Sequence, residues 1–186
     1  MNLRIHALAE ADFDRFATYL NRHLSDNGAP GTGYFQPMPR QASFFSAPRM
    51  AAFREALGKP LPGPGWRRAW VVVDDEEEGA QGAIAGHIDL RAWAEPHTEH
   101  RCLLGMGVDK ACRRAGLGQA LLSHALSWAR EEAGLEWVDL QVLASNERAR
   151  RLYARAGFEP TGLIPAMFKI DGQVLDYVAM SRRLGD

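Results

Sequence analysis

The chain has 186 residues, a length that suits one domain with a substantial core. It carries 22 Lys and Arg against 23 Asp and Glu, which gives a formal net charge of −1. This balance excludes a global basic field, so we expect no nucleic-acid partner and only local sites for anions.

The cysteines and the start of the chain exclude further classes. Cys102 and Cys112 form no CxxC pair and have no His at metal-ligand spacing, so we expect no bound metal. The first residues lack the long apolar run of a signal peptide, and apolar runs such as 70–73 are too short to cross a bilayer. We therefore expect a cytoplasmic protein without a membrane partner.

The N-terminal third predicts a strand, a helix and a long irregular segment. A strand is expected over 2–7, and apolar residues spaced by three and four predict a helix over 10–24. Seven of the ten prolines lie between 26 and 65, among glycines and aromatic residues. This segment predicts loops around at most one helix, near 48–57, and it is a candidate cover for an acceptor site.

The rest of the chain alternates strands and helices and ends on a hairpin. An acidic stretch at 74–82 suits a solvated loop, and Asp171-Gly172 is typical of a type I′ turn. This order predicts an α/β (α+β) fold, a single domain over 1–186 with a mixed, mostly antiparallel sheet and a βαβ centre. The predicted strands are 69–73, 83–90, 102–108, 137–143, 163–170 and 173–180, and the predicted helices are 117–133 and 146–156.

The segment 113–118, Arg-Arg-Ala-Gly-Leu-Gly, lies between the apolar strand that ends at Val108 and the helix that begins near Leu117. The first N–H groups of that helix lack intrahelical acceptors, and the helix dipole adds partial positive charge, so a pyrophosphate can bind there. Gly116 and Gly118 allow close backbone approach or a positive φ, and the two arginines add full charges. A plain strand-to-helix turn with glycines for tightness is the alternative.

Two motifs in this half of the chain resemble one family. RRAGLG after LLGMGV is similar to the RxxGxG coenzyme A loop of the GNAT N-acetyltransferases, and LQVLASNERARRLYARAGFEP resembles that family's next strand and its Asn- and Tyr-bearing helix. The resemblance covers about 71–180, whereas 26–65 matches no motif. It implies a GNAT-like acyl-CoA acyltransferase fold and acetyl-CoA as co-substrate. It also implies direct transfer, in a ternary complex, to a primary amine of a small molecule or a protein.

The resemblance also implies roles for individual residues. Asn146 would bond the pantetheine arm of coenzyme A, and Tyr153 would protonate the departing thiolate, although Asn146 also suits a plain helix N-cap and Tyr153 a core position. The strand edge would offer backbone groups to pantetheine and to the thioester carbonyl. The expected cofactor-binding residues are Met106, Gly107, Val108, Arg113, Arg114, Ala115, Gly116, Leu117, Gly118, Gln119, Asn146 and Tyr153.

The general base departs from the family pattern. Many family members place a Glu on the cofactor strand, where this chain has Leu103. The remaining candidates are Glu99, His87, Asp89 and His100, and the prediction for the catalytic base is His100. The expected acceptor-binding residues are Tyr34, Phe35, His87 and Asp89.

Two other functions stay open. The missing Glu is compatible with a non-catalytic acyl-CoA-binding module that regulates a partner, although Tyr153 argues against that reading. A domain for phosphate ligands or nucleic acid is the other alternative, and a homodimer is not excluded. The basic residues that this last alternative would use are Arg113, Arg114, Arg148, Arg150 and Arg151.

Overall fold

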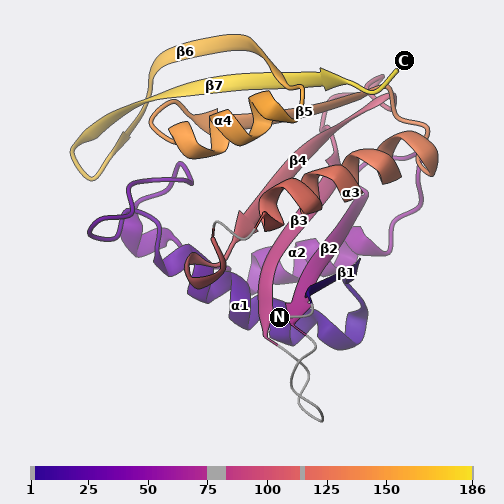
Figure 1. Ribbon diagram of the computed structural model, residues 1–186, viewed down its shortest axis with the longest axis horizontal. Coiled ribbons are helices and arrows are strands. Elements are labelled where there is room, and N and C mark those ends of the chain that lie inside the picture. Colours follow the sequence, from indigo (N-terminus) through magenta and orange to yellow (C-terminus); the bar gives the residue numbers. More distant parts are fainter. Residues whose placement is uncertain (1–2, 75–82, 114–115, 186) are drawn as a thin grey trace.

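The computed structural model describes residues 3–74, 83–113 and 116–185, and it contains an open seven-stranded sheet in the order β1-β2-β3-β4-β5-β7-β6 (Figure 1). Only β4 and β5 pair in parallel, and every other neighbouring pair is antiparallel. The predicted mixed, mostly antiparallel sheet is therefore confirmed. The strands are β1 (Leu3–Ala7), β2 (Arg67–Asp74), β3 (Ile84–Ala92), β4 (Arg101–Val108), β5 (Trp137–Leu143), β6 (Glu159–Ile170) and β7 (Gln173–Arg183).

Helices cover both faces of the sheet. Because successive residues of a strand point to opposite faces, β2 contributes Val71 to one core and Val72 to the other. The first core joins the sheet to α1 and α2, and the second joins it to α3 and α4 (Figure 1). The helices are α1 (Phe13–Ser25), α2 (Ala47–Leu57), α3 (Leu117–Glu131) and α4 (Glu147–Arg155).

The sheet divides where β4 meets β5. Their register joins Arg101 to Trp137, Cys102 to Val138 and Leu103 to Asp139, and it goes no further along these two strands. By contrast, β5 pairs with β7 along its whole length. The β1–β4 half and the β5–β7 half therefore part beyond Leu103, toward the end of β4 from which α3 follows (Figure 1).

Most predicted elements exist, with differences at their ends. The irregular segment contains α2, close to the predicted 48–57, and a short 3₁₀ turn at Arg40–Ala42. Strand β6 begins at Glu159, earlier than the predicted 163, and its register shifts between Ile164 and Phe168. The predicted acidic loop falls mostly on 75–82, which lies outside the described residues.

Candidate active site

The end of β4 presents backbone groups toward the gap in the sheet. The N–H of Asp109 donates to the carbonyl of Ala85 over 2.9 Å, which continues the β3–β4 register. Since hydrogen-bonded and non-hydrogen-bonded pairs alternate in an antiparallel ladder, Gly105 and Gly107 bond to β3, whereas the backbone groups of Met106 and Val108 point toward β5. Beyond Leu103, β5 no longer pairs with them.

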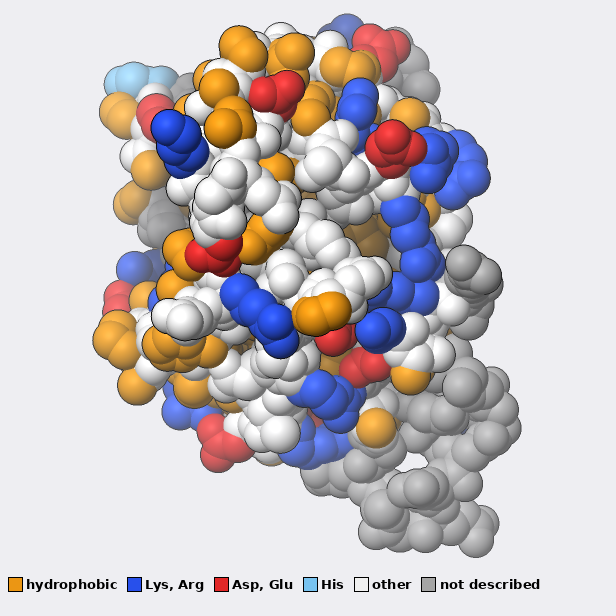
Figure 2. Space-filling view, turned by 90° about the vertical axis from the view of Figure 1, so that its left-hand side faces the viewer, with side chains coloured by type: hydrophobic (Ala, Val, Ile, Leu, Met, Phe, Trp, Pro, Cys, Tyr) orange, Lys and Arg blue, Asp and Glu red, His pale blue; other side chains and the backbone are white. Residues whose placement is uncertain are grey.

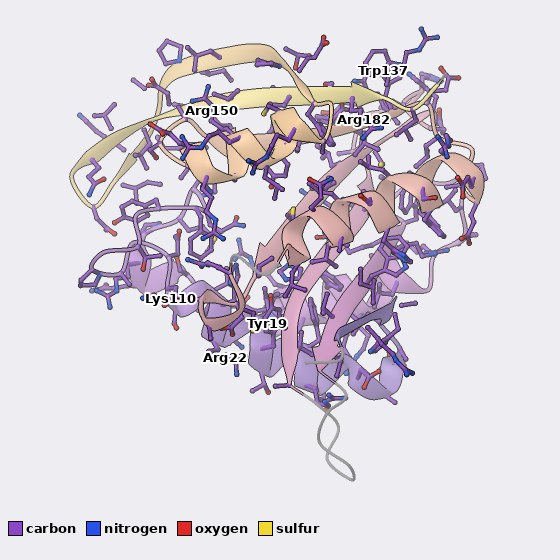
Figure 3. All side chains as sticks on the ribbon, in the orientation of Figure 1. Tyr19, Arg22, Lys110, Trp137, Arg150 and Arg182 are labelled. Atoms are coloured by element: carbon purple, nitrogen blue, oxygen red, sulfur yellow. The ribbon has the colours of Figure 1, made fainter. Side chains whose placement is uncertain are left out.

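A cavity of about 940 Å³ occupies this gap. Figure 2 looks onto this side of the molecule, where Lys and Arg side chains gather beside a hollow in the surface. In Figure 3, Tyr19 on α1 and Arg150 on α4 lie on opposite sides of the region where β4 parts from β5. The predicted site residues that line the cavity are Tyr34, Phe35, Met106, Gly107, Val108, Arg113, Gly116, Leu117, Gly118, Gln119, Asn146 and Tyr153.

The N-terminus of α3 forms one wall of the cavity. Gly116 is its N-cap, with φ 76°, and no side chain caps the first turn there. A Cβ at Gly116 would meet no atom within 4 Å, so the left-handed backbone, not crowding, calls for glycine. Arg113 donates from Nε to the carbonyl of Val108 over 3.3 Å, which holds its guanidinium beside this loop. Arg114 and Ala115, two of the predicted cofactor contacts, lie outside the described residues.

Close packing calls for glycine at position 118, which was not evident from the sequence. A Cβ at Gly118 would lie 2.9 Å from Cδ2 of Leu152 and 3.6 Å from Cε of Met106. Gly118 thus lets the first turn of α3 lie against α4 and β4.

Asn146 and Tyr153 both face the cavity from α4 and its N-cap. Oδ1 of Asn146 accepts a hydrogen bond from the N–H of Ala149 over 3.3 Å, so Asn146 caps α4, as its residue type suggested. Tyr153 is buried and packs edge-on against Phe158, with 5.9 Å between ring centroids. Burial raises the pKa of the Tyr153 hydroxyl, so it carries its proton at neutral pH.

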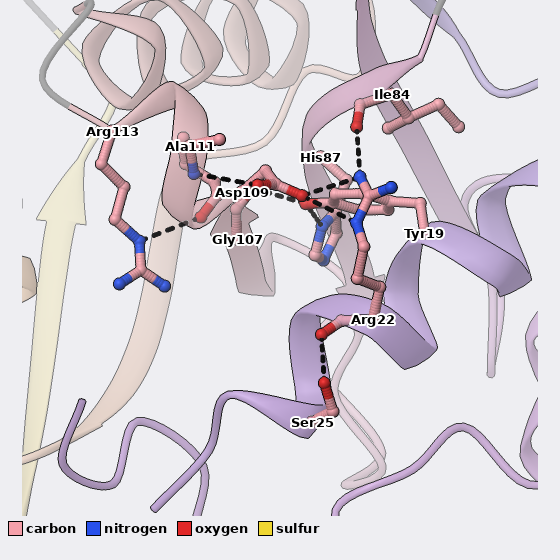
Figure 4. Close-up of polar contacts among 10 residues, drawn as sticks. Tyr19, Arg22, Ser25, Ile84, His87, Gly107, Asp109, Ala111 and Arg113 are labelled. Atoms are coloured by element: carbon pink, nitrogen blue, oxygen red, sulfur yellow. Dashed lines mark hydrogen bonds and ion pairs between the residues drawn. The ribbon is translucent and has the colours of Figure 1, made fainter. Parts of the chain in front are cut away.

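A cluster of buried polar rings lies on the face of β4 that is covered by α1 (Figure 4). The Tyr19 hydroxyl donates to the carbonyl of Gly107 over 3.1 Å, and it lies 3.0 Å from Nδ1 of His87, which then donates its proton to the hydroxyl oxygen. His23 stacks on Tyr19, with 6.0 Å between ring centroids and 15° between the planes. Of these rings only His23 lines the cavity. No role was predicted for Tyr19 or His23 from the sequence.

His87 and Asp89 lie behind the cavity wall. His87 is buried, its Nδ1 is used by Tyr19, and burial lowers its pKa to about 3. Asp89 lies between two guanidinium groups, 3.2 Å from Nε of Arg67 and 3.3 Å from Nη1 of Arg91. Neither predicted acceptor contact is among the lining residues, although Arg91 is.

His100 lies far along the chain from the open end of β4. It is exposed, it precedes the stretch where β4 still pairs with β5, and its carbonyl accepts hydrogen bonds from the N–H groups of Glu136 and Trp137. The extended chain from His100 to Met106 spans roughly 20 Å. Glu99 is exposed beside it. The structure thus does not bring His100 to the cavity, and its assignment as the base stays a prediction.

The described residues contain neither a candidate metal site nor a candidate membrane span. Over 3–74, 83–113 and 116–185, no three His, Cys, Asp or Glu side chains are grouped so that they could hold a metal ion. No helix in the same ranges is long and apolar enough to cross a membrane.

The sequence model of the Acetyltransferase (GNAT) family matches residues 38–158. The chain belongs to this family. The resemblance drawn from the two motifs is thus confirmed. The chain is similar to an uncharacterised N-acetyltransferase of Methanocaldococcus jannaschii, 33% identical over 92 residues, which cover 50% of this chain and 53% of that protein. It is also similar to N-alpha-acetyltransferase RimI of Mycobacterium tuberculosis, 30% identical over 68% of this chain and 78% of that protein.

The match covers only part of some relatives. It spans about half of the Methanocaldococcus protein and 29% of the mycothiol acetyltransferase of Beutenbergia cavernae. Two solved structures share the fold of this GNAT chain along nearly all of its length. The GNAT acetyltransferase of Streptococcus pneumoniae has TM-score 0.78 and 20% identity and covers 99% of this chain and 100% of its own. The acetyltransferase yncA of Salmonella typhimurium, with its cofactor acetyl-CoA, has TM-score 0.75 and 21% identity and covers 100% and 96%.

Proposed function

We propose that the chain is an acetyl-CoA-dependent N-acetyltransferase that transfers the acetyl group to a primary amine by direct attack in a ternary complex. The observation that carries this proposal is the open edge of β4. Met106 and Val108 turn backbone groups into a cavity of about 940 Å³ that extends to the N-terminus of α3. Such an edge can bind an amide-bearing ligand as a strand would, while the helix terminus binds its phosphates.

Residues at different points along the cavity would bind different parts of acetyl-CoA. The pyrophosphate of acetyl-CoA would lie at Gly116 and the first turn of α3, with Arg113 as the nearby cation. The pantetheine arm would follow β4 past Asn146, with the thioester between β4 and Tyr153. Tyr153, which retains its proton, would donate it to the thiolate as the C–S bond breaks.

The acceptor end of the cavity favours an amine that also carries a negative charge. Arg91 lines this end and shares the single carboxylate of Asp89 with Arg67, so the group has excess positive charge. The only carboxylate among the described lining residues is Glu147, at the start of α4, where it pairs with Arg151 over 2.8 Å. Because Asp89 offers one negative charge to two guanidinium groups, the pair keeps a net positive charge that suits a carboxylate or phosphinate group.

Two relatives agree with this acceptor class. The L-amino acid N-acetyltransferase AaaT of Escherichia coli is 24% identical over 54% of this chain, and it covers 62% of that protein. A putative phosphinothricin acetyltransferase of Bacillus subtilis is 27% identical over 63% of this chain and 69% of its own length. The names of both relatives describe acceptors with an amine and an acidic group.

The experiment is a turnover assay that follows thiol release from acetyl-CoA against a panel of amines. Each amino acid is paired with the amine of the same length that lacks the carboxylate, and spermidine and a peptide with a free N-terminus complete the panel. We expect the amino acids to have the highest kcat/KM. Arg91→Gln should raise KM for the amino acids but not for the amines of the same length that lack the carboxylate, which makes each of these amines the matched control.

The outcomes separate the competing functions. Preference for spermidine over every amino acid would overturn the acceptor class but not the acetyltransferase. Tight binding of acetyl-CoA with no turnover of any amine would favour the non-catalytic acyl-CoA-binding module. Binding of a short duplex DNA at modest salt, without binding of acetyl-CoA, would favour the phosphate or nucleic-acid alternative.

A further inference from the structure

His23 has features that core packing does not explain. It is 6% exposed, yet it lines the cavity from the last turns of α1. Its Nδ1 is buried, and no described residue forms a hydrogen bond with it. A Cβ at Gly107 would lie only 2.5 Å from Nε2 of His23. The imidazole therefore meets β4 between Met106 and Val108, the two residues with backbone groups toward the gap.

The position of this imidazole is fixed by the rings around it. His23 stacks on Tyr19, meets His87 edge-on at 6.0 Å and lies 4.9 Å from the ring of Phe35. Tyr19 is itself held by its hydrogen bonds to Gly107 and His87 (Figure 4). A side chain with so little freedom is organised before any ligand enters, as a catalytic group must be.

The charges around His23 keep it neutral and able to accept a proton. Burial first, and then the positive charge of Arg113, lower its pKa to about 4, against smaller opposing effects of Asp109 and Asp26. The other groups near it are uncharged Tyr19 and His87, together with Arg22, which pairs with Asp109 over 2.7 Å. A neutral imidazole with a nitrogen at a cavity wall can accept a proton, but a pKa of about 4 makes it a weak base in the free protein.

Ligand binding would adjust this base. Arg113 lies beside the proposed pyrophosphate site, and its positive charge is one of the causes that lower the pKa of His23. A bound pyrophosphate offsets that charge, so the pKa of His23 rises toward its ordinary value. The imidazole then holds a proton more firmly in the ternary complex than in the free protein.

We propose that His23 is the general base of the transfer and takes the role that the family pattern gives to a Glu at the position of Leu103. This inference rests on the proposed acetyltransferase function. The amine nitrogen forms a bond to the thioester carbon and releases one proton to Nε2 of His23. The C–S bond breaks, and the thiolate takes a proton from Tyr153. The proton on His23 then returns to Tyr153 through solvent, so that atoms and charge balance and both side chains regain their starting forms.

The test compares single-turnover rates and their pH dependence in two variants. His23→Gln keeps a polar side chain but cannot take up a proton, and we expect its rate to fall about 10²- to 10⁴-fold with the affinity for coenzyme A unchanged. The matched control is His124→Gln on α3. His124 also has a buried ring nitrogen without a partner among the described residues, but it packs on Trp70, away from the cavity. This control should keep the parent rate.

A second pair of measurements separates chemistry from structure. Added imidazole should restore turnover in His23→Ala, and NMR titration of the parent protein should show the pKa of His23 rising when coenzyme A binds. If His23→Gln keeps the parent rate and pH profile, the assignment of His23 fails while the acetyltransferase stands. If His23→Gln does not fold, absence of the NMR shift overturns the assignment. If the parent transfers acetyl to no amine, the proposed function fails and the role of His23 fails with it.

Discussion

At the scale of single residues, two glycines of β4 decide how near the neighbouring side chains come to the strand. A Cβ at Gly105 would lie 2.7 Å from Oδ2 of Asp89, and one at Gly107 would lie 2.5 Å from Nε2 of His23. The resemblance placed Gly107 among the cofactor-binding residues. In the structure the two glycines leave room for the carboxylate of Asp89 and the imidazole of His23 on one face of β4.

Tyr153→Phe tests the proton donor. The ring should keep its contact with Phe158, so the melting temperature and the affinity for acetyl-CoA should stay unchanged. Loss of the hydroxyl should lower the single-turnover rate toward the lower end of about 10²- to 10⁴-fold, because a thiolate can leave partly unaided. Tyr177→Phe, which removes another hydroxyl from the lining, is the control. Equal rates for Tyr153→Phe and the parent would show that the hydroxyl donates no proton in the step that limits turnover.

More of the predicted cofactor-binding residues than of the predicted acceptor-binding residues line the cavity among the described residues, for a physical reason. The loop at Gly116 and the cap at Asn146 are local features, whose backbone requirements are written in nearby residues. His23 meets Gly107 only because α1 crosses the far face of β4, a contact between residues 84 positions apart. One His among the apolar positions of a helix carries no signal of that crossing.

At the scale of elements, α3 has its N-terminus at the cavity because β4 and α3 are joined by a short loop that ends in a left-handed residue. Gly116 takes φ 76° with open space around it. For an L residue, the left-handed conformation at this position costs roughly 1–2 kcal/mol of stability, and for Asn it costs less than for most residues. We therefore expect α3 to form with a side chain at position 116, whereas the same side chain would occupy the space proposed for a ligand.

Gly116→Asp and Gly116→Asn form a matched pair that tests the phosphate site. Both side chains have the same size and both tolerate a positive φ, so both variants should fold with a small loss of stability. Only Asp adds a negative charge where a pyrophosphate is expected to bind. We expect calorimetry to detect no coenzyme A binding by Gly116→Asp and weakened binding by Gly116→Asn. Equal affinities of the two variants would contradict a phosphate at this loop.

The start of strand β6 was predicted at 163, later than its position at Glu159, and its exposure explains why. It lies at the edge of the sheet and is exposed along most of its length, so it has no alternation of apolar and polar residues. Pro160 and Gly162 resemble strand breakers in the sequence, but an edge strand tolerates Pro because one side of it needs no partner. The elements with buried faces, such as α3 and β4, were predicted close to their bounds.

At the scale of the whole molecule, the two halves of the sheet share three residue pairs between β4 and β5 and then enclose the cavity. Buried histidines lie next to this opening. Burial lowers the pKa of His23 to about 4 and that of His87 to about 3. In the unfolded chain both would titrate near their ordinary value of about 6.5.

Stability should therefore fall with acid in a defined window. Below pH 6.5 the unfolded chain binds protons that the folded chain does not, so the free energy of unfolding decreases from there to about pH 4 for His23 and to about pH 3 for His87. Each unit of pKa difference is worth about 1.4 kcal/mol, so the loss should reach several kcal/mol. Urea unfolding at a series of pH values measures it. His23→Gln should flatten part of this slope, and an unchanged slope would contradict the burial argument.

Carboxylates act in a separate window. Burial opposes the effect, but hydrogen bonds from the Ala111 N–H and from Arg22 lower the pKa of Asp109, and those from Arg101, Ser181 and Trp93 lower that of Asp139. Their stabilisation is complete above the ordinary carboxyl pKa of about 4 and is lost below it. Above pH 4, the effect of the histidines on the free energy of unfolding can thus be measured without a contribution from Asp109 and Asp139.

The unpaired edge inside the sheet also fixes what a ligand must displace. Backbone amides that face solvent are hydrated, so a ligand that bonds to the N–H groups of Met106 and Val108 must first displace water from them. A molecule that enters along β4 exchanges those waters for its own carbonyl groups, and the count of hydrogen bonds hardly changes. Its affinity then comes mainly from the release of ordered water and from its charged end, not from the new hydrogen bonds themselves.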